Sequence, residues 1–332
     1  MATFPWLAEH RPLATVVAAI AVFGAGAVLA QQPVAIFRAN VNLVKVIASV
    51  KNSKGELVGA LKQADFRVFD NGVEQKIAVF EPQSSQPVSV ALMIDVSGST
   101  AKDLKYETDS AAKFLQALLA GGNPADSVAL YGFDSDVQRW HPFTHNYSSL
   151  ETSLKTIHGS GGTSLYDAIY LGANELEPRS GRKVIVVVSD GGETTSSIKD
   201  IAKPLKAAQL ADAVIYAVVV VPITNDAGRN TGGEHALYYM AAGTGGRQFY
   251  PSSGKELDKA FADIIAELRT QYFLGYYPSG VPLPKDPYHK VEVRVGSPDL
   301  VVNARNGYYG DAEGAVNSAN APVATPVERK KK

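Results

Sequence analysis

Residues 88–100 read VSVALMIDVSGST, and this stretch decides which fold the chain can adopt. A mostly apolar run ends in a carboxylate, and hydroxyl groups follow, with Asp95, Ser97 and Ser99 on alternate positions. A continuous apolar run without alternation is typical of a parallel strand that is buried on both faces of its sheet. Because alternate residues of an extended chain point to the same side, the three polar side chains can converge just beyond the end of this strand.

Strands of the same kind recur along the chain, and helical segments separate them. The apolar runs lie at 88–94, 127–133, 183–189 and 213–221. Helical periodicity appears over 102–120, 165–177, 198–210, 234–242 and 255–270. This alternation predicts an α/β fold, a doubly wound and mostly parallel sheet with helices on both faces. We expect residues 271–278 to form its last strand, so that the domain spans residues 88–278.

The segments on either side of this domain have the sequence pattern of short β-strands joined by turns. Residues 34–83 contain short alternating strands and the turn signal Asn71-Gly72, and residues 286–310 contain a strictly alternating strand followed by another. We expect both flanks to pack into one small β-sandwich, with the α/β domain inserted between them. The alternative is a separate C-terminal hairpin that lies on the α/β domain.

The N-terminus has the pattern of an export signal. Arg11 precedes an apolar run that ends in Val28-Leu29-Ala30, which predicts a signal peptide over residues 1–30 and a periplasmic, cell-envelope or secreted protein. An uncleaved single-span anchor is the alternative, because the apolar stretch approaches the roughly 18 residues that span a bilayer. Only in that case do we expect contact with a membrane. Residues 311–332 contain few large apolar side chains and are predicted to be a disordered tail.

Composition and motifs exclude several classes of function. The chain of 332 residues has a formal net charge of −1 at pH 7, which gives no overall field that would attract nucleic acid. It contains no cysteine, so disulfides, thiolate metal ligands and cysteine nucleophiles are excluded. The position two residues after Asp95 lacks the second acid of an aspartyl-phosphate site, and no Gly-x-Ser-x-Gly turn surrounds Ser97 or Ser99. We therefore expect no catalytic residues, no organic cofactor, no nucleic acid partner and no small-molecule substrate.

Two further segments add oxygen donors to the same edge of the predicted sheet. Thr163 follows Gly161-Gly162 and leads into a helical segment, and Asp190 follows the buried strand 183–189. Ligands of open α/β sheets bind at the carboxyl ends of the strands. An all-oxygen set suits a hard divalent cation, Mg²⁺ first, with Mn²⁺ or Ca²⁺ as other candidates. The competing interpretation of the serines is an ordinary helix N-cap. The predicted metal ligands are Asp95, Ser97, Ser99, Thr163 and Asp190.

The order and spacing of these five residues resembles the von Willebrand factor A (VWA) domain family, whose metal-ion-dependent adhesion site uses Asp-x-Ser-x-Ser, a distant Thr and a distant Asp. The resemblance covers roughly residues 88–278. It implies that the two serines bind the metal directly, the threonine directly or through water, and the two acids mostly through waters. Residues 63–73 and 268–276, with 306–309, also resemble a subfamily of exported bacterial proteins described from Acidobacteria.

A site of this kind leaves the metal able to accept one more ligand. Two carboxylates offset the charge of a divalent cation, neutral hydroxyl groups donate little electron density, and Mg²⁺ takes six ligands. The resemblance implies that the open position takes the carboxylate of an Asp or Glu on a protein partner. We expect an exported, metal-dependent protein-binding or cell-adhesion module. The alternative is a structural scaffold of a cell-envelope assembly whose metal site is constitutively occupied.

Three further acids lie near the predicted ligands in the sequence. Asp167 is placed to accept hydrogen bonds that orient the loops, although an acid in the first turn of a helix is equally explained by the helix dipole. Glu193 is interpreted as a solvated loop residue. Asp103 lies where integrin-like relatives place a second metal ligand, but Lys102 replaces the adjacent acid. We therefore expect no second metal site.

Overall fold

The computed structural model describes residues 43–82, 86–100, 103–220, 231–282 and 287–310. All of them belong to one compact unit, residues 39–332. The predicted signal peptide, residues 1–30, and the predicted tail, residues 311–332, lie outside the described residues. Within the described ranges, no helix is both long and apolar enough to cross a bilayer.

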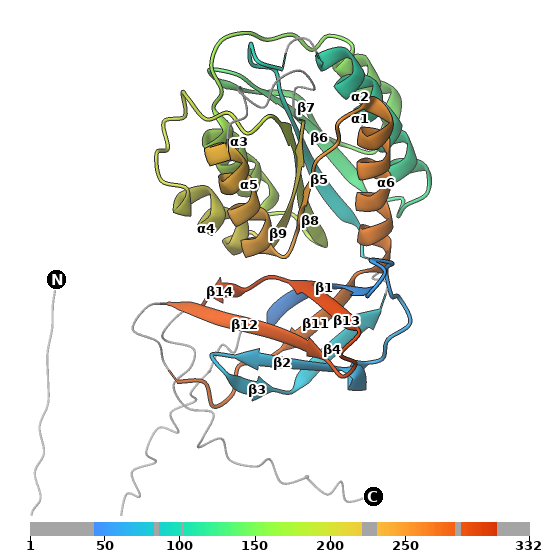
Figure 1. The fold of residues 1–332 in the computed structure, drawn as a ribbon, viewed down its shortest axis with the longest axis vertical. Helices are drawn as coiled ribbons and strands as arrows, with labels where there is room; N and C mark the ends of the chain where they lie inside the picture. The colour runs from blue at the N-terminus through green and yellow to red at the C-terminus, as the bar shows by residue number, and fades with distance from the viewer. Residues whose placement is uncertain (1–42, 83–85, 101–102, 221–230, 283–286, 311–332) are drawn as a thin grey trace, which may run out of the picture. The chain divides into compact units, whose positions relative to one another are not determined.

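A six-stranded sheet forms the centre of the α/β domain (Figure 1). Its strands are β5 (Val88–Asp95), β6 (Ser127–Phe133), β7 (Val137–Thr144), β8 (Arg182–Ser189), β9 (Ala213–Val219) and β10 (Gln248–Phe249). The strand order is β10-β9-β8-β5-β6-β7, and every neighbouring pair is parallel except β6 with β7. All residues of β5, β6 and β9 are buried, which explains why these strands read as continuous apolar runs.

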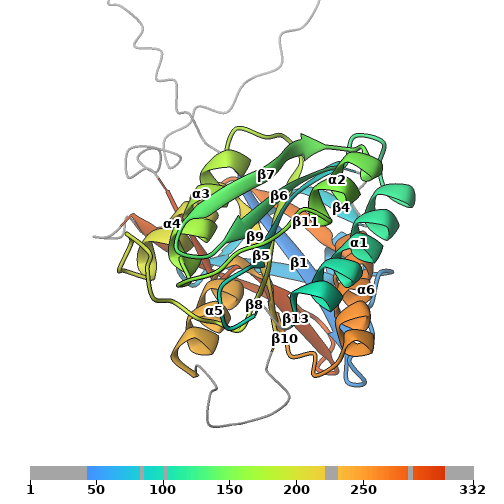
Figure 2. The same ribbon diagram turned by 90° about the horizontal axis from the view of Figure 1, so that it is seen from above.

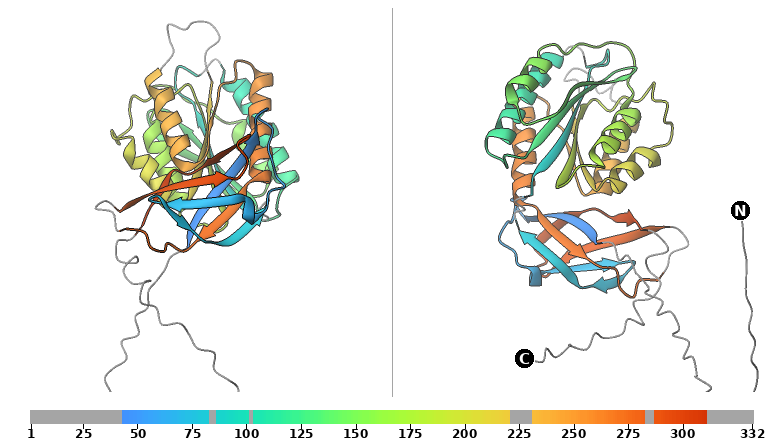
Figure 3. Two further views of the ribbon diagram at one scale, coloured as in Figure 1. Left: turned by 60° about the horizontal axis from the view of Figure 1, so that its bottom comes forward. Right: turned by 180° about the vertical axis from the view of Figure 1, so that it is seen from behind.

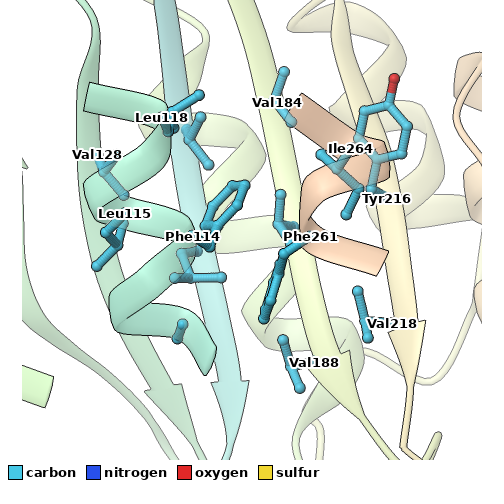
Figure 4. Packing of buried hydrophobic residues seen from close by; sticks show 14 of the residues in the cluster. Phe114, Leu115, Leu118, Val128, Val184, Val188, Tyr216, Val218, Phe261 and Ile264 are labelled. Atoms are coloured by element: carbon cyan, nitrogen blue, oxygen red, sulfur yellow. The ribbon is translucent and has the colours of Figure 1, made fainter. Parts of the chain in front are cut away.

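Helices cover both faces of this sheet, as Figure 2 shows from above. One face carries α1 (Leu104–Ala120), α2 (Tyr147–Leu154) and α6 (Gly254–Thr270), and the other carries α3 (Leu165–Leu176), α4 (Ala202–Leu210) and α5 (Thr231–Thr244). A separate hydrophobic core forms on each face. In the first core, Phe114 of α1 stacks on Phe261 of α6 with ring centroids 4.8 Å apart (Figure 4). The predicted α/β fold class is therefore confirmed.

The segments on either side of the α/β domain form two four-stranded sheets (Figure 3). The N-terminal flank supplies β1 (Val44–Asn52), the 3₁₀ helix η1 (Gln63–Asp65), β2 (Phe66–Asp70), β3 (Val73–Gln75) and β4 (Ile77–Pro82). The C-terminal part supplies β11 (Tyr272–Tyr276), β12 (Tyr288–Val295), β13 (Leu300–Ala304) and β14 (Gly307–Tyr309). The orders β13-β1-β11-β4 and β14-β12-β2-β3 show that both flanks contribute to each sheet. Because side chains of both sheets share one core, the predicted β-sandwich is confirmed and a separate C-terminal hairpin is excluded.

The assignment of residues 271–278 to the α/β sheet is wrong. β11 pairs antiparallel with β1 and with β4, so it belongs to the sandwich. α6 ends at Thr270, Gln271 has an extended backbone, and the chain leaves the α/β domain there. All residues of β11 are buried, and a fully buried strand carries no periodic pattern that would distinguish one sheet from the other.

The segment that follows the Asn71-Gly72 turn forms two strands in different sheets, which its sequence does not reveal. The β2–β3 hairpin turns at Asn71 and Gly72, whose φ angles of 46° and 83° are those favoured by an Asn-Gly turn. Lys76 then separates β3 from β4, and these two strands belong to different sheets of the sandwich. Residues 73–82 therefore form two strands, and the chain crosses from one sheet to the other between them.

Candidate metal centre

The carboxyl ends of β5 and β8 bring the two predicted acidic ligands to one edge of the sheet. β5 ends at Asp95 and β8 ends at Ser189, and these parallel neighbours hold Ile94 opposite Val188. Ser189 Oγ therefore lies beside Asp95 and donates a hydrogen bond of 2.6 Å to Asp95 Oδ2. Asp190 is the next residue after β8, so both acids lie at the same edge.

Asp95 is a fully buried carboxylate, and each of its two oxygens accepts a hydrogen bond. Its exposed fraction is 0%, and Oδ1 accepts a hydrogen bond of 2.9 Å from the backbone N–H of Ser97. The pKa of Asp95 is raised to about 6, mainly by burial and in part by the negative charge of Asp190, while hydrogen bonds from Ser189 and Ser97 act in the opposite direction. A nearby cation would stabilise the ionised form of this group.

The two serines present neighbouring hydroxyl groups. Ser97 Oγ and Ser99 Oγ are 3.1 Å apart, and Ser97 is buried whereas Ser99 is exposed. Two adjacent ligands of an octahedral Mg²⁺, each about 2.1 Å from the metal, lie about 3.0 Å apart. The observed spacing therefore fits a pair of cation ligands. The N-cap interpretation is wrong for both serines, because Asp103 occupies the N-cap position of α1.

Thr163 and Asp190 meet around Gly192. A side chain at position 192 would place its Cβ 3.0 Å from Thr163 Oγ1 and 3.1 Å from Asp190 Oδ1. The backbone N–H of Gly192 donates a hydrogen bond of 2.8 Å to Asp190 Oδ1. The loop of Thr163 is joined to the serine loop by a hydrogen bond of 3.2 Å from Gly98 N to Gly161 O. Three connected loops therefore carry the five predicted residues at the same edge of the sheet.

The donor set at this edge is rich in hydroxyl groups. Within the described ranges, no three Asp, Glu or His side chains lie close enough together to hold a metal ion. A cation here would depend on serine and threonine oxygens as well as on two acids. Such a set of oxygen donors fits a hard divalent cation such as Mg²⁺, Mn²⁺ or Ca²⁺.

Asp167 and Glu193 hold the loops around this edge. Asp167 accepts hydrogen bonds from the backbone N–H groups of Ser197 (2.6 Å) and Ile198 (3.0 Å), so its predicted role in orienting the loops is confirmed. Glu193 is half-buried and accepts a hydrogen bond of 2.6 Å from Ser196 Oγ. The interpretation of Glu193 as a solvated loop residue is therefore wrong.

Two residues at or near this edge lie outside the set predicted from sequence. Ser189 is the polar last residue of an otherwise apolar strand, and its position directly before Asp190 is the signal that could have revealed it. Glu107 is an acid on the apolar face of α1, four residues before Ala111 and seven before Phe114. An acid at such a position is a signal in itself, because charged side chains normally lie on the opposite face of an amphipathic helix.

The raised pKa of Asp95 predicts a pH dependence of stability. In the unfolded chain this group titrates near its ordinary pKa of 3.8, and in the folded, metal-free chain near 6. The folded state therefore binds the proton more tightly, and its stability falls as the pH rises from about 4 through 6. In EDTA, we expect the melting temperature of wild type to fall more between pH 5 and pH 7.5 than that of Asp95→Asn, because the asparagine side chain does not ionise. Equal losses in the two proteins would contradict the prediction.

Comparison with known proteins finds similarity to one domain family. Residues 90–193 match the family model of the von Willebrand factor type A domain. Similar solved structures include the conserved hypothetical protein BatB from Bacteroides thetaiotaomicron, with 19% identity over 55% of this chain and 98% of that chain and a TM-score of 0.43. The vWF domain of the type V pili tip protein Mfa5 from Porphyromonas gingivalis is 15% identical over 55% of this chain and 95% of that chain, with a TM-score of 0.44.

The match to a third solved structure covers more of this chain but a smaller share of the other chain. The pilus adhesin SpaC from Lactobacillus rhamnosus GG, in its open conformation, is 11% identical over 74% of this chain and 43% of that chain, with a TM-score of 0.46. No curated protein sequence matches the chain significantly. The match over residues 90–193 therefore shows that this part of the α/β domain, from β5 to the residues just after β8, is similar to the von Willebrand factor type A domain.

Proposed function

We propose that this protein is an exported, cation-dependent protein-binding module. The VWA domain would bind a divalent cation, Mg²⁺ first, at Asp95, Ser97, Ser99, Thr163 and Asp190, and through that cation the carboxylate of an Asp or Glu on a partner protein. The observation that carries the proposal is the pair of serine hydroxyls 3.1 Å apart, at the edge of the sheet where one acid ends β5 and another directly follows β8. Export rests on the basic, apolar and small-residue pattern that ends at Ala30.

The burial of the five residues indicates that a partner's ligand could reach the cation from one side only. Asp95, Ser97 and Thr163 are buried, whereas Ser99 is exposed and Asp190 is half-exposed. A cation held from the protein side in this way would be reached by a ligand from the solvent side. Hydroxyl oxygens leave much of the cation charge unneutralised, so an anionic oxygen ligand is favoured over a neutral or cationic group.

Capture of partners in the presence and absence of the cation tests the proposal. The purified protein, immobilised and exposed to a cell-envelope extract, should retain partner proteins in millimolar Mg²⁺, lose them in EDTA and regain them when Mg²⁺ is restored. Retention of the same proteins in both buffers would contradict the proposal and favour a scaffold whose contacts do not involve the metal site.

A matched pair of serine variants shows whether the loss in EDTA arises at this site. Ser99→Ala removes an exposed hydroxyl group from the candidate centre and should reduce capture in Mg²⁺. Ser148→Ala removes an exposed hydroxyl group from α2 and should capture as wild type does. Equal capture by the two variants would contradict the assignment of Ser99 to the centre.

A further inference from the structure

Glu107 is a buried acid whose carboxylate lacks a hydrogen-bond partner among the described residues. Its exposed fraction is 1%, and neither carboxylate oxygen has a partner among the residues that the structure describes. Buried polar groups are nearly always hydrogen-bonded, and an unpaired buried carboxylate destabilises the fold. The neighbouring side chains on this face of α1 are mostly apolar, so packing within the domain does not explain an acid at this position.

The helix geometry directs Glu107 toward the interior of the domain. Ala111, Phe114 and Leu118 follow it at spacings of four, seven and eleven residues, share its helix face and are buried. Glu107 lies in the first turn of α1, which is the end of the helix nearest to the loop that carries the two serines. Its side chain is therefore on the inward face of α1, at the edge where β5 ends.

Electrostatic coupling links this carboxylate to the candidate metal centre. Burial raises the pKa of Glu107, and the negative charges of Asp95, Asp103 and Asp190 raise it further. Two of these three acids belong to the centre. The charges of both candidate acidic ligands thus act on Glu107, and no described residue donates a hydrogen bond to its carboxylate.

We propose that Glu107 is a positioning residue of this cation site, and that its carboxylate accepts a hydrogen bond from a water molecule bound to the cation. The inference rests on the proposed function. Glu107 is not a direct ligand, because no three acids of the described residues lie close enough together to share one metal ion. Carboxylates beyond the direct ligands commonly orient what the metal binds. A hydrated cation beside Ser97 and Ser99 would supply both the positive charge and the donor that Glu107 lacks.

The variant Glu107→Gln tests this role with two separate readouts. It keeps the size of the side chain and removes its negative charge. Titration calorimetry should show Mn²⁺ binding about tenfold weaker than in wild type. In EDTA the melting temperature should rise, because an unpaired buried acid is gone. A purely structural residue would change the melting temperature and leave the Mn²⁺ affinity unchanged, and that result would overturn the proposal.

Two further variants separate position from charge. Asp109→Asn removes one negative charge from the exposed side of the same helix, where Asp109 pairs with Lys105, and it should bind Mn²⁺ as wild type does. Glu107→Asp keeps the charge on a shorter side chain and should bind Mn²⁺ more tightly than Glu107→Gln does. A tenfold loss in Asp109→Asn, or no difference between the two Glu107 variants, would overturn the proposal.

The outcome also distinguishes this inference from the function on which it rests. If wild type binds Mn²⁺, Asp95→Ala does not and Glu107→Gln binds normally, the positioning role is wrong and the cation site stands. If wild type binds no divalent cation, both the inference and the proposed function are wrong.

Discussion

Replacing Asp95 by alanine is expected to weaken the binding of Mg²⁺ or Mn²⁺ by about 100-fold or more. Asp95 is the most deeply buried acid of the candidate centre, and it fixes the serine loop through the hydrogen bond from Ser97 N–H to Oδ1. Its removal takes away one of the two charges that would offset the cation and the side-chain hydrogen bond that holds Ser97 in place. Titration calorimetry on wild type and variant measures the difference directly.

The stability of the same variant shows whether the loss is specific. In EDTA, Asp95→Ala should remain folded, because the raised pKa of Asp95 means that its ionised form destabilises the metal-free protein. Mn²⁺ should raise the melting temperature of wild type and leave that of the variant unchanged, since only a state that binds the cation gains stability from it. Cation affinity of the variant equal to that of wild type would contradict the assignment.

Asp126 provides a matched control at the opposite edge of the same sheet. It is a buried acid that accepts hydrogen bonds from the backbone N–H groups of Val88 (2.7 Å) and Asn123 (2.8 Å). Asp126→Ala should lower the melting temperature, because it leaves two backbone donors unpaired, and should not alter cation affinity. The pair of variants therefore separates the loss of a ligand from the loss of a buried acid.

Replacing Asp70 by alanine is expected to lower the free energy of unfolding by about 3–5 kcal/mol. Asp70 is fully buried at the end of β2. Its Oδ2 accepts hydrogen bonds from Tyr276 Oη (3.0 Å) and Tyr308 Oη (2.8 Å), and its Oδ1 lies 2.9 Å from His289 Nδ1. Burial raises the pKa of both tyrosines, so their hydroxyl groups are donors at neutral pH. Without Asp70 these buried groups lose a shared partner.

This cluster holds together the two parts of the sandwich that are furthest apart in sequence. Asp70 comes from the N-terminal flank, while Tyr276, His289 and Tyr308 come from β11, β12 and β14. Urea denaturation of Asp70→Ala and of Glu74→Ala measures the effect, because Glu74 is an exposed acid on β3 whose ion pair with Arg67 is at the surface. Glu74→Ala should change stability by less than about 1 kcal/mol. A change of that size in Asp70→Ala would contradict the role given to the cluster.

The α/β domain could be predicted because its strands are buried on both faces. β5 and β9 contain only buried residues, and such strands remain recognisable in sequence as uninterrupted apolar runs. The candidate centre was predictable for a related reason. One of its acids ends β5 and the other directly follows β8, and parallel strands bring their carboxyl ends to one edge.

The elements that were missed lack such a pattern. β7 is an edge strand whose residues are half-buried or exposed throughout, so it shows neither a continuous apolar run nor clean alternation. α2 has only two buried side chains, Leu150 and Leu154, which is too short a pattern to reveal a helix. β11 was assigned to the wrong sheet because pairing with β1 and β4 is fixed by the packing of distant segments rather than by local sequence.

The environments of single acids depend on the tertiary fold in the same way. Glu193 accepts a hydrogen bond from Ser196 three residues on, but neither the turn that aligns them nor their burial can be derived from residue types. Asp70 directly precedes the turn signal Asn71-Gly72, and the partners that make it a buried acceptor lie more than 200 residues away in the chain. The residue types at the strand ends indicated the candidate metal ligands. Which other acids form stabilising hydrogen bonds depends on the tertiary fold.

Anomalous scattering from Mn²⁺ tests the central claim most directly. Crystals of the protein grown or soaked with millimolar MnCl₂ should show one anomalous difference peak at the carboxyl edge of β5 and β8, about 2.2 Å from both Ser97 Oγ and Ser99 Oγ. Crystals of Asp95→Ala treated in the same way should show no peak there. Absence of a peak in the wild-type crystals, or a peak that does not contact the two serines, would contradict the account.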